Sequence, residues 1–386
     1  MTFSFSVLRD TVAAMKVCID IQSAVTQRAG VGRYTRELVQ HLGSAAPDDQ
    51  FLLSYFDFKG DANPITIPNA EQHVVRWCPG RMAQLAWRKL HWPPYDSFVG
   101  NADLYHFPNF IIPPIHKNKK AVVTIHDMSY VPYPHFAEER NVNYLRTHMR
   151  RTVDRADAII TVSEFSAQEI CNYLNVDKGR IFAVHHGISD AFARPNAETT
   201  ARTLADCKLE RPYLLTVGTV EPRKNLHLLI DIYEQLTDFD GDLVIAGGLG
   251  WRVESILEHI RKSPRAKSIR LLGYTDDSSL PGLYAGASAF LLTSHYEGFG
   301  FPPVEAMACG TPVVSSTGGS LAEVLGDGAV LVDSHSAEAW AEHIRRVLGD
   351  SAFRKHLIDR GRAKAASYTW AKAATETMAV YRQVMQ

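Results

Sequence analysis

Cysteine is scarce in this chain, and its few residues lie far apart. There are five, an odd number, and no two of them form a C-x-x-C pair. Zinc sites use closely spaced cysteines or histidines, and small secreted scaffolds use a dense disulfide framework. Neither class is expected, and a reducing cytoplasm is the predicted compartment. The cysteines are Cys18, Cys78, Cys171, Cys207 and Cys309.

Long apolar runs are also missing. A membrane-spanning helix needs about 20 apolar residues, whereas the longest runs here, such as residues 121–125 and 287–292, have the length of strands. The first fourteen residues, MTFSFSVLRDTVAA, carry no basic start before a sustained apolar stretch, so they fit a loose extension better than a signal peptide. We therefore expect a protein that does not cross a membrane.

Neither charge sign is in excess. Lysine and arginine number 41 against 42 aspartates and glutamates, which gives a formal net charge of -1. Without a positive field, nucleic acid is not an expected partner. The content of 46% hydrophobic and 22% charged residues is that of a folded protein rather than a disordered one.

The chain does have length and a regular alternation of patterns. Its 386 residues exceed the size of about 250–300 residues at which one hydrophobic core stops growing, so two domains are expected. Short β-branched runs alternate with helical patterns, as in parallel α/β sheets. The polar residues 189–212 between the two series are predicted to be a linker. Strands are expected at residues 16–21, 51–55, 73–76, 103–106, 121–125, 158–162 and 181–184, then at 213–217, 243–246, 269–272, 289–292, 312–315 and 329–332.

The most informative stretch is residues 294–310, SHYEGFGFPPVEAMACG, which reads as a strand end, a glycine-rich loop and a helix start. Gly298 and Gly300 allow the backbone to approach a ligand closely. Pro302 and Pro303 suit the first turn of a helix, where no amide donor is needed. A helix N-terminus at the carboxyl edge of a sheet is a site for a diphosphate.

Two carboxylates frame this loop. Glu297 precedes the glycines and Glu305 follows the prolines, so both can face one extended ligand and accept hydrogen bonds from hydroxyl groups. The simpler interpretation is that Glu305 complements the helix dipole and that Glu297 is a solvated loop acid. Their joint presence around Gly-Phe-Gly-Phe-Pro-Pro favours the functional interpretation.

The stretch from Glu297 to Pro312 resembles the E-G-F-G-x-P-x-x-E-A-M-A-x-G-x-P motif of family 4 of the retaining glycosyltransferases. The resemblance implies that Glu297 binds the hydroxyls of the donor sugar and that Glu305 binds the ribose hydroxyls. It also assigns the loop to the donor, through Gly298, Phe299, Gly300 and Phe301. Within the family, the chain most resembles the bacterial mannosyltransferase-B-type enzymes of O-antigen and exopolysaccharide assembly.

The resemblance covers nearly the whole chain and implies an α/β fold of the GT-B type, in which two Rossmann-like domains face a central cleft. It divides the chain into an acceptor-side domain at residues 1–195 and a nucleotide-sugar-binding domain at residues 205–368. A last helix at residues 369–386 is expected to pack back toward the first domain. No cofactor is implied, because the nucleotide diphosphate sugar is a substrate.

A second motif, residues 217–225 with the sequence VGTVEPRKN, follows the first strand of the second series. Arg223 and Lys224 are therefore expected in the cleft, where fixed cations would stabilise the charge of a leaving diphosphate. An exposed basic pair at a turn is the simpler interpretation of the residues alone. The R-K-N pattern of the family instead implies that both residues, with Gly218, bind the donor diphosphate.

In the first domain, Thr124-Ile-His-Asp127 ends an apolar strand at the carboxyl edge of the sheet. A lone histidine there is more often structural. The resemblance implies that His126 contacts the transferred sugar and that Asp127 supports it. No third residue completes a Ser-His-Asp triad, so hydrolysis through a serine is not proposed.

Two further loops carry weaker signals. Residues 27–33, QRAGVGR, join the first strand to the first helix. The resemblance implies that this loop, with Gly30 and Gly32, faces the donor phosphate and the acceptor. The loop TGGSLAE at residues 317–323 matches a position near the nucleotide. A helix capped by Ser320, with Glu323 completing a capping box, explains this loop equally well.

No metal is expected. His185 and His186 are adjacent, lack companions at ligand spacing, and project oppositely from an extended chain. Ser163 is predicted to cap a helix. No D-x-D pair precedes a cleft-facing loop, and Arg223 with Lys224 would supply the positive charge.

The residues and the resemblance together predict a metal-independent, retaining hexosyltransferase. GDP-mannose is the expected donor by resemblance, and the acceptor is a glycan or lipid-linked oligosaccharide. A UDP-sugar such as UDP-glucose or UDP-GlcNAc is the alternative donor. Hydrolysis or epimerisation of a nucleotide sugar is a rival reaction, and a noncatalytic nucleotide-sugar-binding scaffold is a rival of another class. A phosphorylase would need a cofactor lysine that the sequence does not identify.

Basic and aromatic residues alternate between residues 76 and 92, which suits the anionic surface of a membrane. The simpler interpretation is a solvated helix with packed tryptophans. The predicted location is therefore cytoplasmic, with peripheral contact at the cytoplasmic face of the inner membrane as the open possibility. The residues are Arg76, Trp77, Arg81, Trp87, Arg88, Lys89, His91 and Trp92.

Overall fold

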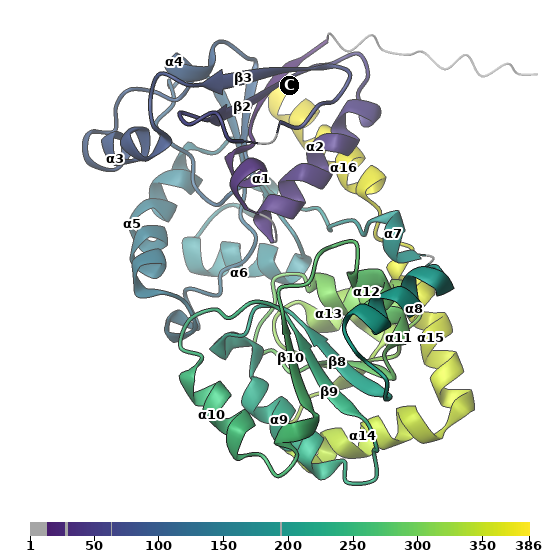
Figure 1. Ribbon diagram of the computed structural model, residues 1–386. Coiled ribbons are helices and arrows are strands. Elements are labelled where there is room, and N and C mark those ends of the chain that lie inside the picture. The colour runs from purple at the N-terminus through teal and green to yellow at the C-terminus, as the bar shows by residue number, and fades with distance from the viewer. Residues whose placement is uncertain (1–13, 28–29, 63, 194) are drawn as a thin grey trace, which may run out of the picture.

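The computed structural model describes residues 14–386 except 28–29, 63 and 194. The expected extension at the N-terminus therefore lies outside the described residues, apart from Ala14. Two sheets, each made of parallel strands and flanked by helices, lie one above the other in Figure 1. The predicted α/β class with two Rossmann-like domains is confirmed.

The first sheet has seven parallel strands in the order β3-β2-β1-β4-β5-β6-β7. Alternate residues of each strand point to opposite faces. In β1, Val17 and Ile19 enter the core under one face, whereas Cys18 enters the core under the other. The strands are β1 (Lys16–Asp20), β2 (Gln50–Phe56), β3 (Ala70–Val75), β4 (Leu104–Phe107), β5 (Lys120–Thr124), β6 (Ala158–Thr161) and β7 (Ile181–Ala183).

Helices cover both faces of this sheet. α2 and the C-terminal α16 share the core of one face, and α3, α4, α5 and α6 share the core of the other. The helices are α1 (Gln22–Thr26), α2 (Val31–Ala45), α3 (Gly80–Leu90), α4 (Asp96–Val99), α5 (Glu139–Arg155), α6 (Glu164–Leu174) and α16 (Trp370–Met385).

The second sheet has six parallel strands in the order β10-β9-β8-β11-β12-β13. They are β8 (Tyr213–Val217), β9 (Asp242–Ala246), β10 (Ile269–Gly273), β11 (Ala289–Leu292), β12 (Val313–Ser316) and β13 (Val330–Val332). The helices are α9 (Leu226–Gln235), α10 (Glu254–Lys262), α11 (Leu280–Gly286), α12 (Phe301–Cys309), α13 (Leu321–Leu325), α14 (Ala337–Gly349) and α15 (Ser351–Ala365).

The prediction of a linker at residues 189–212 is wrong in part, because this segment contains two helices, α7 (Asp190–Ala193) and α8 (Ala197–Asp206). α8 is capped by Asn196, whose side chain accepts from the amide of Glu198 at 2.8 Å. It packs on α11, where Gly282 leaves room for Thr203: a Cβ at that glycine would lie 2.7 Å from the threonine hydroxyl. The polar composition of this segment did not predict α8, because the helix packs on α11 through a small contact rather than through a broad apolar face.

The chain crosses between the domains twice. After α15 it returns to the first domain, where α16 lies beside α2 (Figure 1). The two crossing segments touch, since the amide of Ile188 donates to the carbonyl of Tyr368 at 3.0 Å. The phenol of Tyr381 in α16 then bonds His106 Nδ1 at 2.7 Å beneath the sheet. Among the described residues, no helix is long and apolar enough to cross a membrane.

Candidate active site between the two domains

The glycine-rich loop after β11 places its residues at the carboxyl edge of the second sheet. Gly300, with φ of 91°, is the N-cap of α12, and Phe301 and Pro302 follow in the first turn. The helix therefore begins at Phe301, and Pro302 and Pro303 lie in its first turn as expected. Positive φ is open to glycine at little steric cost, which explains this residue at the turn.

Glu297 is held by the two cations of the second motif. Its carboxylate lies 2.7 Å from Lys224 Nζ and 2.8 Å from Arg223 Nη1, and Arg223 also pairs with Glu221 at 2.7 Å. Burial raises the pKa of Glu297, but the charges of Arg223 and Lys224 outweigh it and lower the pKa to about 2. The carboxylate is therefore ionised at neutral pH, and the solvated-acid interpretation is wrong because Glu297 is 8% exposed.

Local backbone geometry fixes the two cations. They lie in the short 3-10 turn Pro222–Lys224, and Asn225 after it adopts φ of 50°. Gly218, at the end of β8, has φ of 145°, and a Cβ there would lie 3.2 Å from Lys224 Cε. The glycine thus leaves the space in which the lysine side chain runs toward Glu297.

Glu305 pairs with a residue of the other domain. It is 1% exposed, its Oε1 lies 2.5 Å from Arg33 Nη1, and its Oε2 accepts from the hydroxyl of Tyr284 at 2.9 Å. A buried carboxylate held by a specific cation is more than a helix-dipole partner. Sequence reasoning did not single out Arg33; its place in the first turn of α2, behind Gly30 and Gly32, was the available signal.

Gly30 and Gly32 lie at the start of α2. Gly30 is its N-cap with φ of 59°, and a Cβ at Gly32 would lie 2.1 Å from the carbonyl oxygen of Gln27. Both glycines therefore serve the turn that brings Arg33 to Glu305. Residues 28–29 of this loop lie outside the described part of the chain.

His126 follows β5 and is 8% exposed. Its Nε2 lies 2.8 Å from the carbonyl oxygen of Pro108, and a carbonyl only accepts, so Nε2 carries the proton and Nδ1 is the acceptor in the neutral ring. Burial lowers the pKa of His126. Its ring contacts Tyr34 and Phe110, with centroids 4.9 and 5.3 Å away.

Asp127 does not hydrogen-bond His126. Its Oδ1 instead accepts from the amide and hydroxyl of Ser129 at 3.0 and 2.7 Å. Burial lowers the pKa of His126, and the charge of Asp127 offsets part of this effect by raising it. The expected support of His126 by Asp127 is therefore electrostatic.

The loop of the second domain touches the strand end that carries His126. A Cβ at Gly298 would lie 2.6 Å from the carbonyl oxygen of His126, and the Gly298 carbonyl accepts from Ser163 Oγ at 2.9 Å. Ser163 also caps α6 as predicted, accepting from the amide of Ser166 at 3.1 Å. The structure thus brings His126 to the loop that follows Glu297.

Phe299 and Phe301 lie in an aromatic cluster between the domains. The ring of His186 stacks on Phe301 at 4.6 Å and meets Phe299 edge-on at 4.9 Å. Trp370, at the start of α16, lies 6.2 Å from Phe301. The side chains of these phenylalanines therefore join the domains, and only their backbone remains a candidate donor contact.

The predicted capping box after β12 is wrong. Ser320 makes no side-chain cap bond; its amide and hydroxyl donate to the carbonyl of Glu297 at 2.9 and 3.1 Å. Glu323 reaches the other domain, where it accepts from the amides of Glu164 and Phe165 at 2.9 Å each. It also pairs with His185 Nε2 at 2.8 Å.

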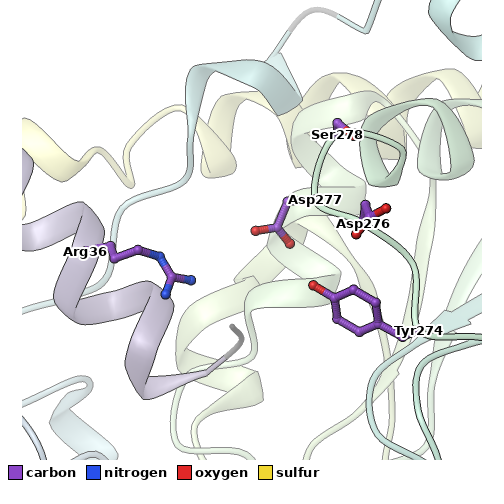
Figure 2. Close-up of a pocket in the computed structure, with 5 residues that line it drawn as sticks. All are labelled: Arg36, Tyr274, Asp276, Asp277 and Ser278. Carbon is purple, nitrogen blue, oxygen red and sulfur yellow. The ribbon is translucent and has the colours of Figure 1, made fainter. Parts of the chain in front are cut away.

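A cavity of about 400 Å³ opens near the Arg33–Glu305 pair. It lies between α2 and the loop after β10 and is lined by Arg36, Tyr274, Asp276, Asp277 and Ser278. Figure 2 shows the Arg36 guanidinium, the Asp277 carboxylate and the Tyr274 hydroxyl directed toward the same space. Asp277 is also close enough for its charge to raise the pKa of Arg33.

No cluster of three potential metal ligands occurs among the residues that the structure describes. Arg223 and Lys224 lie in the turn after β8, at the carboxyl edge of the second sheet, and both pair with Glu297 in the loop before α12. Fixed cations and backbone amides can together bind an anion.

The sequence matches known protein families over both domains. Residues 28–192 match the family described as Glycosyltransferase Family 4, and residues 204–364 match Glycosyl transferases group 1. O-antigen chain mannosyltransferase B of Escherichia coli is 32% identical over 95% of this chain and 100% of its own length. The chain belongs to glycosyltransferase family 4. The resemblance carried by the Glu297–Pro312 motif is thereby confirmed.

Solved structures support the same fold for this glycosyltransferase. Sucrose-phosphate synthase from Thermosynechococcus elongatus superposes with a TM-score of 0.75 at 20% identity, over 96% of this chain and 98% of that one. Anabaena HepE, solved with UDP and glucose, gives 0.70 at 16% identity over 96% and 99%. At this identity the likeness shows the GT-B fold alone, and the GT-B prediction is confirmed.

Proposed function

We propose that this glycosyltransferase transfers mannose from GDP-mannose, with retention of configuration and without a metal, to a glycan or lipid-linked acceptor in bacterial surface polysaccharide synthesis. The observation that carries the proposal is the buried cluster in which Lys224 and Arg223 hold Glu297 at 2.7 and 2.8 Å. The relative from Escherichia coli, named as a mannosyltransferase, favours mannose.

The groups of this cluster suit a nucleotide diphosphate donor. Lys224 and Arg223 would bind the diphosphate and stabilise the charge that develops as it leaves. Glu297 would then accept hydrogen bonds from hydroxyls of the sugar. The amides at the start of α12 add donors for the phosphate oxygens.

The nucleoside would extend toward Glu305 and the cavity of Figure 2. Glu305 would accept from the ribose hydroxyls, in exchange for or alongside its bond to Arg33. The same cavity also bears on the identity of the base, because the carboxylates of Asp276 and Asp277 line it. A carboxylate accepts two hydrogens side by side, which the N1–H and 2-amino group of guanine present, whereas uracil presents one N–H between two carbonyls. Guanine is therefore favoured over uracil.

Retention would follow from attack on the face that the diphosphate leaves. In the described part of the chain, the two carboxylates beside His126 and Lys224 already have partners: Glu297 is bound by two cations, and Asp127 accepts from Ser129. We therefore propose no covalent nucleophile. The leaving phosphate would take the proton of the acceptor hydroxyl, while neutral His126 contacts the sugar. Gly30 and Gly32 would act indirectly, by placing Arg33.

Calorimetric titration tests the donor. GDP and GDP-mannose should bind with micromolar affinity and more tightly than UDP, ADP and their sugar conjugates. Glu305→Gln should weaken GDP binding about tenfold, the loss of roughly one charged hydrogen bond. Glu258→Gln, an exposed change on α10, is the control. Tighter binding of UDP or UDP-glucose would show that the donor is a UDP-sugar rather than GDP-mannose. A UDP-sugar is the second candidate because HepE was solved with UDP.

A product assay separates the rival functions. Proton NMR of the product should show the anomeric configuration of the donor, and EDTA should leave the rate unchanged. Free mannose or an epimer formed without acceptor would instead identify a hydrolase or epimerase. Donor binding without any turnover across an acceptor panel would identify the noncatalytic scaffold.

Peripheral contact with a membrane is a further part of the proposal. Trp87 packs under α3, with its ring 5.8 Å from that of Phe56, as the simpler interpretation expected. Trp92 does not fit it, because it is 65% exposed. Trp77 fits it only in part, because its ring stacks on Phe98 at 5.1 Å but is 71% exposed. Met82 and Leu85 of α3 are also exposed, at 63% and 52%. Apolar side chains beside arginine and lysine suit the interface of an anionic bilayer.

A further inference from the structure

Tyr296 links the glycine-rich loop after β11 to the first domain. It directly precedes Glu297 and is 2% exposed. Its backbone carbonyl accepts from Arg223 Nη1 at 2.6 Å, and the same nitrogen lies 2.8 Å from the carboxylate of Glu297. One guanidinium therefore holds both residues.

The phenol of Tyr296 bonds two groups of the first domain. Its oxygen accepts from the amide of Met128 at 3.3 Å and donates to Oε2 of Glu169. A hydroxyl can donate and accept at the same time, so the two bonds are compatible. Burial and the charges of Asp127 and Glu169 raise the pKa of Tyr296. The phenol therefore stays protonated at neutral pH and remains a donor to the carboxylate.

Both partners lie beside groups of the proposed reaction centre. Met128 is two positions after His126 in the segment that follows β5. Glu169 lies in α6, whose cap residue Ser163 donates to the carbonyl of Gly298 at 2.9 Å. In Figure 1, α6 lies at the side of the first domain that faces the second.

Packing also fixes the side chain of Tyr296. Its ring meets those of Tyr133 and Phe165 edge-on, at centroid distances of 5.8 and 5.9 Å. Both rings belong to the first domain, whereas the backbone of Tyr296 belongs to the second. A phenylalanine could keep these ring contacts but not the hydrogen bonds, so the hydroxyl needs an explanation of its own.

The hydroxyl bears on how His126 and Glu297 are placed. These two residues lie in different domains, so their relative position depends on contacts between the domains. The close approach of Gly298 to the carbonyl of His126 limits how near the loop can come. The bond from Met128 to Tyr296 holds the loop and the segment of His126 together. Misplacement of reacting groups by about 1 Å can cost roughly 100-fold in rate.

Glu169 strengthens this contact through its charge. Burial raises the pKa of Glu169, the hydrogen bond from Tyr296 lowers it, and the charge of Asp127 raises it. The bond from the phenol therefore favours the ionised carboxylate. Hydrogen bonds to charged groups contribute more than those between neutral groups.

We infer that Tyr296 is a positioning residue of the transfer reaction, whose hydroxyl fixes the segment of His126 against Glu297. Met128 and Glu169 are the groups through which it acts. The inference rests on the proposed transferase function. Tyr296 does not touch the reacting atoms in this role; it acts through the two residues that do.

Tyr296→Phe, made in the full chain, tests the inference. The variant keeps the ring and loses the hydroxyl, so kcat should fall at least about tenfold, the loss of one charged hydrogen bond. The affinity for GDP should stay within about twofold of the wild type, because the cations and carboxylates of the donor cluster are unchanged. Tyr233→Phe is the matched control. The buried phenol of Tyr233 donates to the carbonyl of Gly241 at 2.6 Å, at the amino end of the second sheet, so kcat should not change.

Variants of Glu169 show whether the hydroxyl acts through this carboxylate. Glu169→Ala should lower kcat in the wild type and add little further loss to Tyr296→Phe, because groups in direct contact are not additive. Glu169→Gln should recover part of the loss seen in Glu169→Ala, since its amide oxygen can still accept from the phenol. Full additivity of Glu169→Ala and Tyr296→Phe would contradict the inference.

The amide signal of Met128 gives a readout that does not depend on turnover. With ¹⁵N-methionine labelling, it should shift in Tyr296→Phe and stay in place in Tyr233→Phe. A normal kcat in Tyr296→Phe, an equal loss in Tyr233→Phe, or a loss of GDP affinity in step with kcat would overturn the inference. A wild type that transfers no sugar would count against the proposed function itself, and an unshifted Met128 signal would show separately that the contact is absent.

Discussion

Arg33 of α2 and Glu305 of α12 form a buried ion pair of 2.5 Å across the two domains, 272 positions apart in the chain. The pair joins the first turn of one Rossmann-like domain to the helix that follows the donor loop of the other. If Glu305 binds the ribose, as we propose, the same carboxylate both binds the donor and pairs with Arg33 of the other domain. The two processes are then coupled.

Arg33→Met should destabilise the protein strongly. The substitution leaves the carboxylate of Glu305 buried with only the hydroxyl of Tyr284, and an unpaired buried charge costs about 3–5 kcal/mol. Adding Glu305→Gln removes that charge, so the double variant should be more stable than Arg33→Met alone. Urea unfolding of the four proteins in the cycle measures the coupling. Strictly additive effects would contradict a direct ion pair.

The sequence could predict residues that local order places at one edge of a sheet. Glu297, Lys224 and His126 each follow a buried strand, and parallel strands bring such positions to a common edge. The sequence could not predict the partners of Arg33 or Glu323, because these contacts depend on how one domain sits against the other. The helix α8 was hidden for a related reason: its packing depends on the space left by Gly282.

Gly298→Ala should slow transfer with little effect on GDP affinity. The new Cβ would lie 2.6 Å from the carbonyl of His126 and 2.9 Å from Asp127 Cβ, so the donor loop must move away from the first domain. Misplacement by about 1 Å costs roughly 100-fold in rate. Steady-state kinetics should therefore show a lower kcat, whereas Gly349→Ala, with nothing within 4 Å, should match the wild type. A Gly298→Ala enzyme with normal kcat would argue against this approach of the loop to His126.

Lys224→Ala should lower kcat by about 100- to 1,000-fold, the usual loss when one fixed group that stabilises transition-state charge is removed. It also leaves Glu297 with Arg223 as its cation. The effect should be the same with EDTA or with added Mg²⁺, since the lysine supplies the charge. Lys262→Ala, an exposed change on α10, is the control. Restoration of activity by a divalent cation would contradict metal-independent transfer.

Acid should destabilise the fold through its buried histidines. Burial lowers the pKa of His106 to about 3 and also lowers the pKa of His126 and His186. Below a pH of about 6.5 these histidines bind protons in the unfolded chain but stay neutral in the folded chain. The free energy of unfolding therefore falls as the pH falls. For His106 the fall continues to about pH 3, at up to about 1.4 kcal/mol per pH unit.

His106→Gln should therefore reduce the slope of unfolding free energy between pH 6 and pH 4 by about 1.4 kcal/mol per pH unit. The glutamine can still bond Thr124 or Tyr381, which His106 contacts at 2.8 and 2.7 Å. His343→Gln, on an exposed position of α14, controls for the loss of one imidazole. An unchanged slope in His106→Gln would show that His106 does not resist protonation in the folded state.

The outer face of α3 should bind vesicles that contain phosphatidylglycerol. Each basic residue near an anionic surface contributes about 1 kcal/mol, so Arg81→Glu with Lys89→Glu should abolish most cosedimentation. Neither residue belongs to the donor cluster of Glu297, Arg223 and Lys224, so GDP affinity should not change. Lys262→Glu with Lys355→Glu, two exposed changes in the second domain, is matched in charge. Absence of wild-type binding, or an equal loss in this control, would count against α3 as the contact surface. Binding that survives high salt but is lost in Leu85→Asp would instead show that the apolar contact dominates, because salt screens only the charges.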